Sequence, residues 1–364
     1  MKSNDLVSNL MEVPPFGLED KQKQEFMLSR LCDLTSHHYH RNEAYRNILN
    51  GVFDGEKALT FERVEDAPFV PVSLFKRFDL LSVPQEDVVK VLTSSGTTGQ
   101  AVSRIFLDRE TARFQETVLV KIVQNFLGKE RLPMVIIDHQ SVVRNRQSYS
   151  ARGAGVLGMV QFGRRPIYAL REDMSLDLDA VLSYLKSANT DRVLFFGFTY
   201  MVWQYFVREL ERLNVQLDLP NTILIHSGGW KKLQDLSVDA GEFRGRIKSL
   251  TGIQNVINFY GMVEQVGSIF LENELHFLHA SNYSDILIRD PVTLKPLPNG
   301  ETGIVQLVSM LPTSYPGHSI LTEDLGVIRG VDHPGLKMRG KFFEILGRVP
   351  KSDLRGCSDT YQPA

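Results

Sequence analysis

The middle of the chain alternates short apolar runs with longer helical patterns, and this alternation constrains the fold more than any other feature of the sequence. The expected strands cover residues 134–137, 192–196, 222–226 and 256–259, and the expected helices cover 109–127, 176–188, 199–213 and 240–250. Strands that alternate with helices at this spacing form a mostly parallel sheet whose faces are covered by helices. The sequence therefore predicts an α/β fold.

The pattern changes after about residue 267. Helical periodicity fades, and short β-like runs follow one another, separated by turn residues such as those at 298–300. These runs cover residues 285–288, 304–308, 326–328 and 342–346. We expect an α/β core over residues 1–275 and a small β-rich part over 276–364. Residues 60–90 are broken by prolines and predict no clear element.

Composition excludes several classes of protein. The chain has 364 residues, of which 41 are basic and 43 acidic, so nothing favours nucleic acid or an anionic membrane surface as a partner. No apolar stretch is long enough to span a bilayer, and the first twenty residues lack a signal-peptide pattern. With only two cysteines, a disulfide scaffold is not expected. A cytoplasmic protein is the expectation.

A loop rich in hydroxyl groups and glycine follows a short strand at residues 88–92. Its residues are Thr93, Ser94, Ser95, Gly96, Thr97, Thr98, Gly99 and Gln100. Glycine lets the backbone approach an anion closely, and loop N–H groups together with hydroxyls cradle phosphate oxygens. The pattern lacks the Gly-Lys-Ser/Thr ending of a Walker loop. We interpret it as a phosphate-binding loop, with a ligand-free turn as the alternative.

Further motifs follow this loop in a fixed order along the chain. They are Gly228-Gly229, the run from Asn258 to Glu264 that contains Tyr260 and Gly261, the turn 300–303, Thr322-Glu323-Asp324, and Gly347-Arg348. Together with the loop, they resemble the motifs of the adenylate-forming superfamily of ATP-using enzymes. The resemblance implies that an acid is activated as its acyl-AMP.

The resemblance also implies roles for individual residues. Gly228 and Gly229 would contact adenosine, the Tyr260 ring would stack on adenine, Glu264 would bind Mg²⁺, and Asp324 would hold the ribose hydroxyls. Thr97 would be among the loop groups that stabilise negative charge during catalysis. The alternatives are that Tyr260 is plain core, Glu264 a surface charge and Asp324 a turn residue.

The chain departs from most of the superfamily in three places, one of which is Val263, where the family motif has threonine before the glutamate. Only 16 residues follow Arg348, which leaves no room for the mobile C-terminal cap that carries a catalytic lysine. The lysine often found just after the phosphate loop is missing as well. Positive charge must therefore come from elsewhere. Arg348 is the first candidate, and Arg144, Arg146 and Arg152 are weaker ones.

These departures match one branch of the superfamily, and the chain resembles that branch, the LuxE-type acyl-protein synthetases. The local features that carry this likeness are the loop with Leu107-Asp108 after it, the run from His226 to Lys231, and Leu354 to Cys357. The branch implies that a fatty acyl group moves from AMP to Cys357 and then to an acyl reductase subunit, which supplies aldehyde for bioluminescence. A thioesterase subunit is a further partner that the likeness implies. Cys357 as an inert tail residue is the alternative.

Other residues leave two interpretations open. His226 ends a strand at the edge where α/β proteins bind ligands, so it lines the substrate pocket or is a structural histidine. The aromatic run at 195–205 either walls an acyl tunnel or is ordinary core. Cys32 lies in an apolar helical pattern and is expected in the core. The cluster at His37–His40 lacks other ligands at metal spacing.

Two other functions compete with acyl-protein synthesis. A relative with the same fold would load an acyl or aryl acid onto a carrier protein or coenzyme A. A degenerate binding subunit would hold nucleotide or acyl groups without chemistry; the missing lysines favour it, and Cys357 beside an intact phosphate loop argues against it.

Overall fold

The computed structural model describes residues 10–94, 102–143, 151–190, 192–230 and 238–349. Their contacts group the chain into two compact units. The β-rich unit contains the described residues up to Ser94, those from 102 to 126, and those from Tyr260 onward; the parallel-sheet unit contains the described residues from Leu127 to Phe259. The division into 1–275 and 276–364 that the sequence suggests stays a prediction.

The parallel-sheet unit confirms the α/β expectation. Its strands are β4 (Leu132–His139), β5 (Gly163–Leu170), β6 (Leu194–Phe198), β7 (Ile223–Ser227) and β8 (Asn255–Tyr260). They lie in the order β5-β4-β6-β7-β8, and all of these pairs are parallel. Apolar side chains fill the middle of the sheet, since every residue of β6 is buried. The aromatic residues Phe195 and Phe196 are therefore part of a packed interior.

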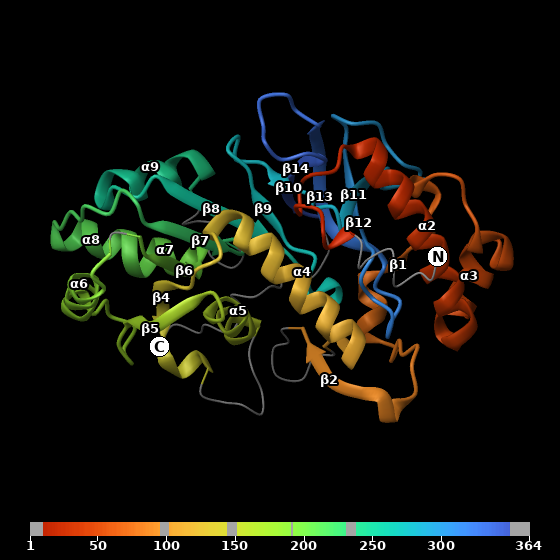
Figure 1. The fold of residues 1–364 in the computed structure, drawn as a ribbon, viewed down its shortest axis with the longest axis horizontal. Helices are drawn as coiled ribbons and strands as arrows, with labels where there is room; N and C mark the ends of the chain where they lie inside the picture. The colour runs from red at the N-terminus through yellow and green to blue at the C-terminus, as the bar shows by residue number, and fades with distance from the viewer. Residues whose placement is uncertain (1–9, 95–101, 144–150, 191, 231–237, 350–364) are drawn as a thin grey trace. The chain divides into compact units, whose positions relative to one another are not determined.

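Helices connect these strands (Figure 1). They are α5 (Ala151–Val160), α6 (Leu178–Ser187), α7 (Thr199–Val202), α8 (Arg208–Leu213) and α9 (Ala240–Thr251), with a π-helical turn at Trp203–Val207 between α7 and α8. The expected helix at 199–213 is thus interrupted by a π-turn. Asp177 and Asp239 cap α6 and α9 by accepting a hydrogen bond from the backbone N–H three residues later.

The β-rich unit is built on an antiparallel sheet. Its strands are β9 (Phe270–Glu272), β10 (Leu278–His279), β11 (Ser284–Arg289), β12 (Thr302–Ser309), β13 (Ser319–Val331) and β14 (Lys341–Arg348), in the order β11-β12-β13-β14-β10-β9. The short strand β1 (Val70–Pro71) pairs with β13 in parallel. The four β-like runs expected after residue 267 are all strands of this sheet.

Segments from the N-terminal third complete the β-rich unit. They are the helices α2 (Asp20–Arg41), α3 (Glu43–Val52) and α4 (Arg109–Leu127), the hairpin strands β2 (Val88–Thr93) and β3 (Arg104–Asp108), and the 3₁₀ turns η1 (Gly55–Leu59), η2 (Val64–Asp66), η3 (Val72–Lys76) and η4 (Gln85–Asp87). The described residues also form the 3₁₀ turn η8 (Val263–Gln265) in this unit and η5 (Gln140–Val143) in the parallel-sheet unit. The proline-rich stretch 60–90 therefore forms short turns and strands.

A buried charge cluster fixes α2 to this sheet. Asp285 on β11 accepts hydrogen bonds from the ammonium groups of Lys23 on α2, at 3.0 Å, and Lys341 on β14, at 2.8 Å. The two lysines hold the pKa of Asp285 well below its usual range despite its burial. Removing one partner of such a buried group strands a charge, which costs about 3–5 kcal/mol. The cluster therefore stabilises the packing of α2 (red in Figure 1) against the sheet.

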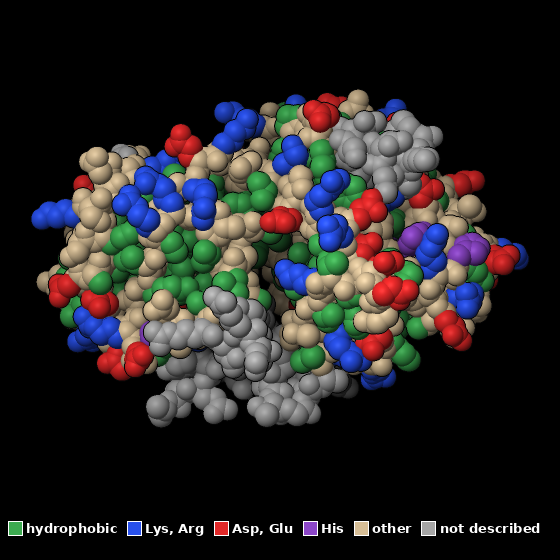
Figure 2. Space-filling view, turned by 60° about the horizontal axis from the view of Figure 1, so that its bottom comes forward, with side chains coloured by type: hydrophobic (Ala, Val, Ile, Leu, Met, Phe, Trp, Pro, Cys, Tyr) green, Lys and Arg blue, Asp and Glu red, His purple; other side chains and the backbone are tan. Residues whose placement is uncertain are grey.

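Charge is mixed on the surface that Figure 2 shows. Lys and Arg side chains are interspersed with Asp and Glu side chains rather than gathered into one area of this face. None of the helices in the described part of the chain is both long and apolar enough to cross a membrane.

Candidate active site

Tyr260, Asp324 and Arg348 meet in the β-rich unit. The Tyr260 hydroxyl donates a hydrogen bond to Asp324 Oδ2 with an O–O distance of 2.6 Å, and Arg348 Nε lies 3.6 Å from Asp324 Oδ1. The register of β13 and β14 pairs Asp324 with Arg348 directly. Burial and the neighbouring Asp324 carboxylate raise the pKa of Tyr260 well above its usual value, so the hydroxyl remains a donor. An aromatic ring and a fixed carboxylate thus stand side by side.

Glu264 lies on η8, directly after this tyrosine segment, and is only 5% exposed. Burial raises the pKa of Glu264, whereas the Ser103 hydroxyl and the positive charge of Lys76 act in the opposite direction. A nearby cation stabilises a buried carboxylate. Mg²⁺ is usually held by one or two carboxylates together with phosphate oxygens and water, so a single glutamate fits such a site.

The stem of the proposed phosphate loop is a two-stranded hairpin. Thr93 pairs with Arg104 at the end of β2 and β3. Beyond this pair, the Ser94 N–H donates to the Ser103 carbonyl at 3.1 Å, and the Ser103 N–H donates to Ser94 Oγ at 2.9 Å. The predicted loop residues Ser95, Gly96, Thr97, Thr98 and Gly99 lie outside the described residues.

His226, Gly228 and Gly229 belong to the parallel-sheet unit, at the carboxyl end of β7. Strand order reverses at β4, which lies between β5 and β6, and open α/β sheets bind ligands outside the carboxyl ends near such a point. Gly228 has a φ of +84°, a left-handed conformation that glycine adopts without strain. The backbone there can turn closely around a ligand.

The environment of His226 favours a neutral ring. Thr199 Oγ1 donates to the Ser227 carbonyl at 3.2 Å, which leaves its oxygen to accept from His226 Nδ1 at 2.9 Å. The imidazole packs against the Phe243 ring with a centroid distance of 4.7 Å. Burial, with a smaller contribution from Arg244, lowers the pKa of His226 to about 3. The site residue is thus an uncharged polar group in an aromatic setting.

The arginines considered as sources of positive charge have acidic neighbours where they are described. Arg348 lies near Asp324 and also 4.0 Å from Glu323 Oε2. Arg152 Nε lies 3.2 Å from Asp138 Oδ2, and both side chains are largely buried. Arg144, Arg146 and Cys357 lie outside the described residues. The charges of Arg348 and Arg152 are therefore already partly balanced.

The contacts of the histidine cluster and of Cys32 are those of residues that contribute to packing. His38 Nδ1 bonds to Ser82 Oγ at 2.8 Å, and its ring stacks on that of His318 at 5.0 Å. Within the described ranges, no group of three or more His, Cys, Asp or Glu side chains is arranged to hold a metal ion. Cys32 is half-buried, and burial raises the pKa of its thiol.

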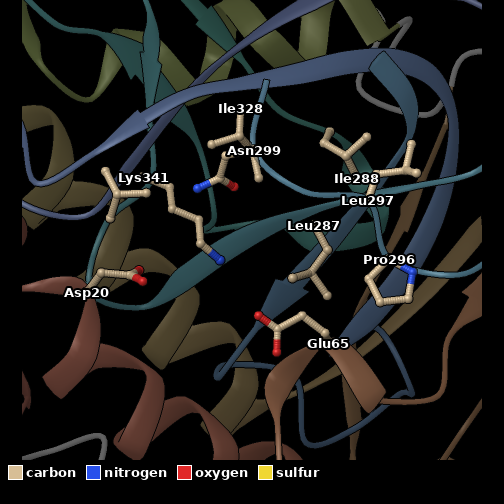
Figure 3. A pocket seen from close by; sticks show the side chains of 10 residues that line it. Asp20, Glu65, Leu287, Ile288, Pro296, Leu297, Asn299, Ile328 and Lys341 are labelled. Atoms are coloured by element: carbon tan, nitrogen blue, oxygen red, sulfur yellow. The ribbon is translucent and has the colours of Figure 1, made fainter. Parts of the chain in front are cut away.

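A small pocket of the β-rich unit has a different location from the predicted site residues. Its volume is about 160 Å³, and its lining comes mainly from the sheet and its connecting loops. Figure 3 shows the side chains of Asp20, Glu65 and Lys341 pointing into it. Since none of the predicted site residues lines this pocket, we assign it no part in the chemistry.

The sequence did not single out Ser103 or Lys76, two of the groups that lower the pKa of Glu264 against the effect of burial. Neither belongs to a motif. Ser103 could have been found from its place at the exit of the phosphate loop, because a loop stem commonly returns to its site. Lys76 lies in the stretch that predicted no element, and no sequence signal marks it.

The fold is that of adenylate-forming ligases. An open conformation of 2-hydroxyisobutyryl-CoA ligase in complex with 2-HIB-AMP and CoA matches with a TM-score of 0.70 at 15% identity, over 93% of this chain and 77% of that one. The same ligase in the thioesterification state matches with a TM-score of 0.67 at 16% identity, over 90% and 68% of the two chains. This confirms the fold class expected from the motifs.

The chain belongs to the LuxE acyl-protein synthetase family, whose model matches residues 1–364. It is 28% identical to the long-chain-fatty-acid–luciferin-component ligase of Vibrio harveyi, over 93% of this chain and 88% of the relative. It is 26% identical to the ligase of the same name from Aliivibrio fischeri, over 88% and 84%. The protein is therefore a ligase of the acyl-protein synthetase class, as the sequence predicted.

Proposed function

We propose that this protein activates a long-chain fatty acid with ATP as acyl-AMP, transfers the acyl group to Cys357, and passes it to an acyl reductase partner. The observation that carries the nucleotide part is the Tyr260–Asp324 hydrogen bond of 2.6 Å, which places a carboxylate beside an aromatic ring. Adenosine offers the matching groups, a flat base and a pair of ribose hydroxyls. The similarity to two relatives named long-chain-fatty-acid–luciferin-component ligases supports the fatty acid as the substrate.

The described residues have distinct tasks in this proposal. Tyr260 stacks on adenine, Asp324 accepts hydrogen bonds from the ribose hydroxyls, and Gly228 and Gly229 let the backbone approach the nucleoside. Glu264 holds Mg²⁺, which would neutralise charge on the phosphates when bound. Burial raises the pKa of Glu264, and a bound cation would lower this pKa again by favouring the carboxylate.

The first chemical step is a displacement at phosphorus. A carboxylate oxygen of the fatty acid forms a bond to the α-phosphorus of ATP, the bond from this phosphorus to the bridging oxygen breaks, and pyrophosphate leaves with the electron pair. No proton needs to move. The protein's contribution is positioning and charge stabilisation. Thr97 and its loop neighbours, together with Arg348, would supply part of that stabilisation.

The second step moves the acyl group to sulfur. The Cys357 thiolate attacks the acyl carbonyl, a thioester forms, and AMP leaves as the anion. Arg355, Lys351 and Arg348 are close to Cys357 in sequence and would favour the thiolate. The thioester would then pass to the reductase subunit, with a thioesterase subunit as a further member of the complex.

The test is incubation with ATP, Mg²⁺ and radiolabelled tetradecanoic acid, followed by denaturing electrophoresis with and without hydroxylamine. We expect a labelled band that hydroxylamine removes. Cys357→Ser should abolish the band but keep ATP–pyrophosphate exchange, and Cys32→Ser is the matched control that should keep both. Labelling retained in Cys357→Ser would refute the thiol assignment.

The alternative is a ligase that loads an acyl or aryl acid onto a carrier protein or coenzyme A. The adenylating residues would be the same, so the fold supports both. A free thioester in solution with no labelled protein band would identify this alternative. A protein that binds ATP but exchanges no pyrophosphate with any acid would instead be a binding subunit.

A further inference from the structure

Lys76 brings a positive charge to Glu264 from a part of the chain that carries no motif. It is the last residue of η3, which directly follows β1. β1 pairs in parallel with β13, with Val70 opposite Ile320 and Pro71 opposite Leu321. A strand pairing across some 250 residues of sequence therefore sets where Lys76 lies.

The packing around Lys76 converges on the same place. η3 contacts both β13, the strand of Asp324, and β3, the strand that leaves the phosphate loop. Phe75 is 1% exposed and belongs to an apolar cluster against which Met262, two residues before Glu264, also packs. The turn that ends in Lys76 and the turn that carries Glu264 are thus anchored on one cluster.

Tyr315 connects the two turns a second time. Its ring packs edge-on against Phe75 with a centroid distance of 6.3 Å. The same ring and the Glu264 carbonyl both lie close to Gly317. A Cβ atom added to this glycine would lie 2.8 Å from the Glu264 carbonyl oxygen. Phe75, Tyr315 and the Glu264 backbone therefore form a continuous packed path.

The ammonium group of Lys76 differs from the guanidinium group of Arg348 in its ion-pair partners. Its side chain is half-buried, and no described residue forms an ion pair or hydrogen bond with it. Arg348, in contrast, lies against Asp324 and Glu323. A half-buried ammonium that forms no ion pair with any residue in the described ranges is available for an anionic ligand, such as a phosphate oxygen beside a divalent cation that Glu264 would hold.

We propose that Lys76 is a catalytic residue whose ammonium binds a non-bridging oxygen of the ATP α-phosphate during adenylation. It supplies positive charge near a phosphate loop that is followed by Gln100 and Ala101 rather than by the lysine often found there in the superfamily. As the fatty-acid carboxylate attacks and pyrophosphate leaves, negative charge is redistributed over the phosphate oxygens. The ammonium stabilises this charge and transfers no proton. The proposal rests on the adenylating function proposed above.

The test compares Lys76→Met, Lys76→Arg and Lys57→Met in ATP–pyrophosphate exchange with tetradecanoic acid. Methionine keeps most of the aliphatic stem and removes the charge. Lys57 is the matched control because it is an exposed lysine in η1, a five-residue 3₁₀ turn like η3 in the same unit. Urea unfolding of each variant reports on folding.

Loss of one group that stabilises a transition-state charge lowers kcat about 100-fold. We expect this loss in Lys76→Met with the urea midpoint unchanged and a smaller change in the KM for ATP. Lys76→Arg should recover at least about tenfold of it, because arginine keeps the charge, and Lys57→Met should match the wild type. A merely structural role would move the urea midpoint and would not show this split between kcat and KM.

Two results would overturn the assignment, and they are distinguishable. In the first, the wild type exchanges pyrophosphate and the kcat of Lys76→Met stays within about threefold of the wild-type value, a smaller change than the loss of one charged contact would cause. Lys76 is then not catalytic, although the proposed function stands. If the wild type exchanges pyrophosphate with no acid tested, the proposed function itself fails, and the catalytic role of Lys76 fails with it.

Discussion

The hydrogen bond between Tyr260 and Asp324 can be tested by Tyr260→Phe, which removes one oxygen and leaves the ring in place. Asp324 Oδ2 would lose its partner at 2.6 Å, while Arg348 would still lie 3.6 Å from Oδ1. A hydrogen bond to a charged group contributes about 1.5–3 kcal/mol. Because Arg348 remains, we use the lower end, and about 1.4 kcal/mol corresponds to a tenfold change in affinity.

The expected result is a KM for ATP about tenfold higher, with kcat at saturating ATP nearly unchanged, because the ribose contact affects ground state and transition state alike. ATP–pyrophosphate exchange over a range of ATP concentrations measures both quantities. Tyr283→Phe is the matched control, since Tyr283 is a fully buried tyrosine of the same unit whose hydroxyl donates to the Leu10 carbonyl at 3.3 Å. An unchanged KM in Tyr260→Phe would refute the idea that this hydroxyl prepares Asp324 for the ribose.

Three further predictions concern buried groups. Glu264→Gln should abolish Mg²⁺-dependent exchange yet raise the urea midpoint at pH 7, because burial raises the folded-state pKa above the unfolded value of 4.5 and ionisation above that pH therefore costs stability. His226 binds a proton in the unfolded state below pH 6.5 but in the folded state only near pH 3, so stability falls as the pH drops through this window. His226→Gln should make that slope shallower by up to about 1.4 kcal/mol per pH unit in urea titrations at pH 4 to 6.5. Gly317→Ala would bring a Cβ atom too close to the Glu264 carbonyl, so it should raise several-fold the Mg²⁺ concentration that gives half-maximal exchange. Gly245→Ala is the control and should leave this concentration unchanged, because its added Cβ meets nothing within 4 Å.

The parallel sheet was predictable because its signal is local. Apolar runs of strand length between helical segments are visible without knowledge of the partners. The observed strands β4 and β8 contain the expected ones, and β6 and β7 overlap theirs with shifts of one or two residues. The interruption of the helix at 199–213 was not predictable, because a π-turn depends on how a helix packs against its neighbours. Local pattern gives the element, and tertiary packing gives its irregularity.

The candidate site divides in the same way. Tyr260, Glu264 and Asp324 stand in motifs, so the sequence alone proposes them as site residues, and the structure adds the hydrogen bond between Tyr260 and Asp324. Lys76 could not be found, because its position depends on the pairing of β1 with β13 rather than on its own surroundings in sequence. A two-residue strand next to prolines carries almost no periodic signal.

The charges described around Glu264 show why a divalent cation belongs to the proposed mechanism. Glu264, Glu323 and Asp324 are acidic, whereas Lys76 and Arg348 are basic, so the ionised groups leave a net charge of −1. A triphosphate would meet net repulsion from these groups alone. One Mg²⁺ bound by Glu264 would change the sign to +1, and because these groups are partly buried, salt would screen the change only weakly. The same cation would also offset the cost of keeping Glu264 ionised in a buried position, so binding of the metal and binding of the nucleotide should reinforce each other.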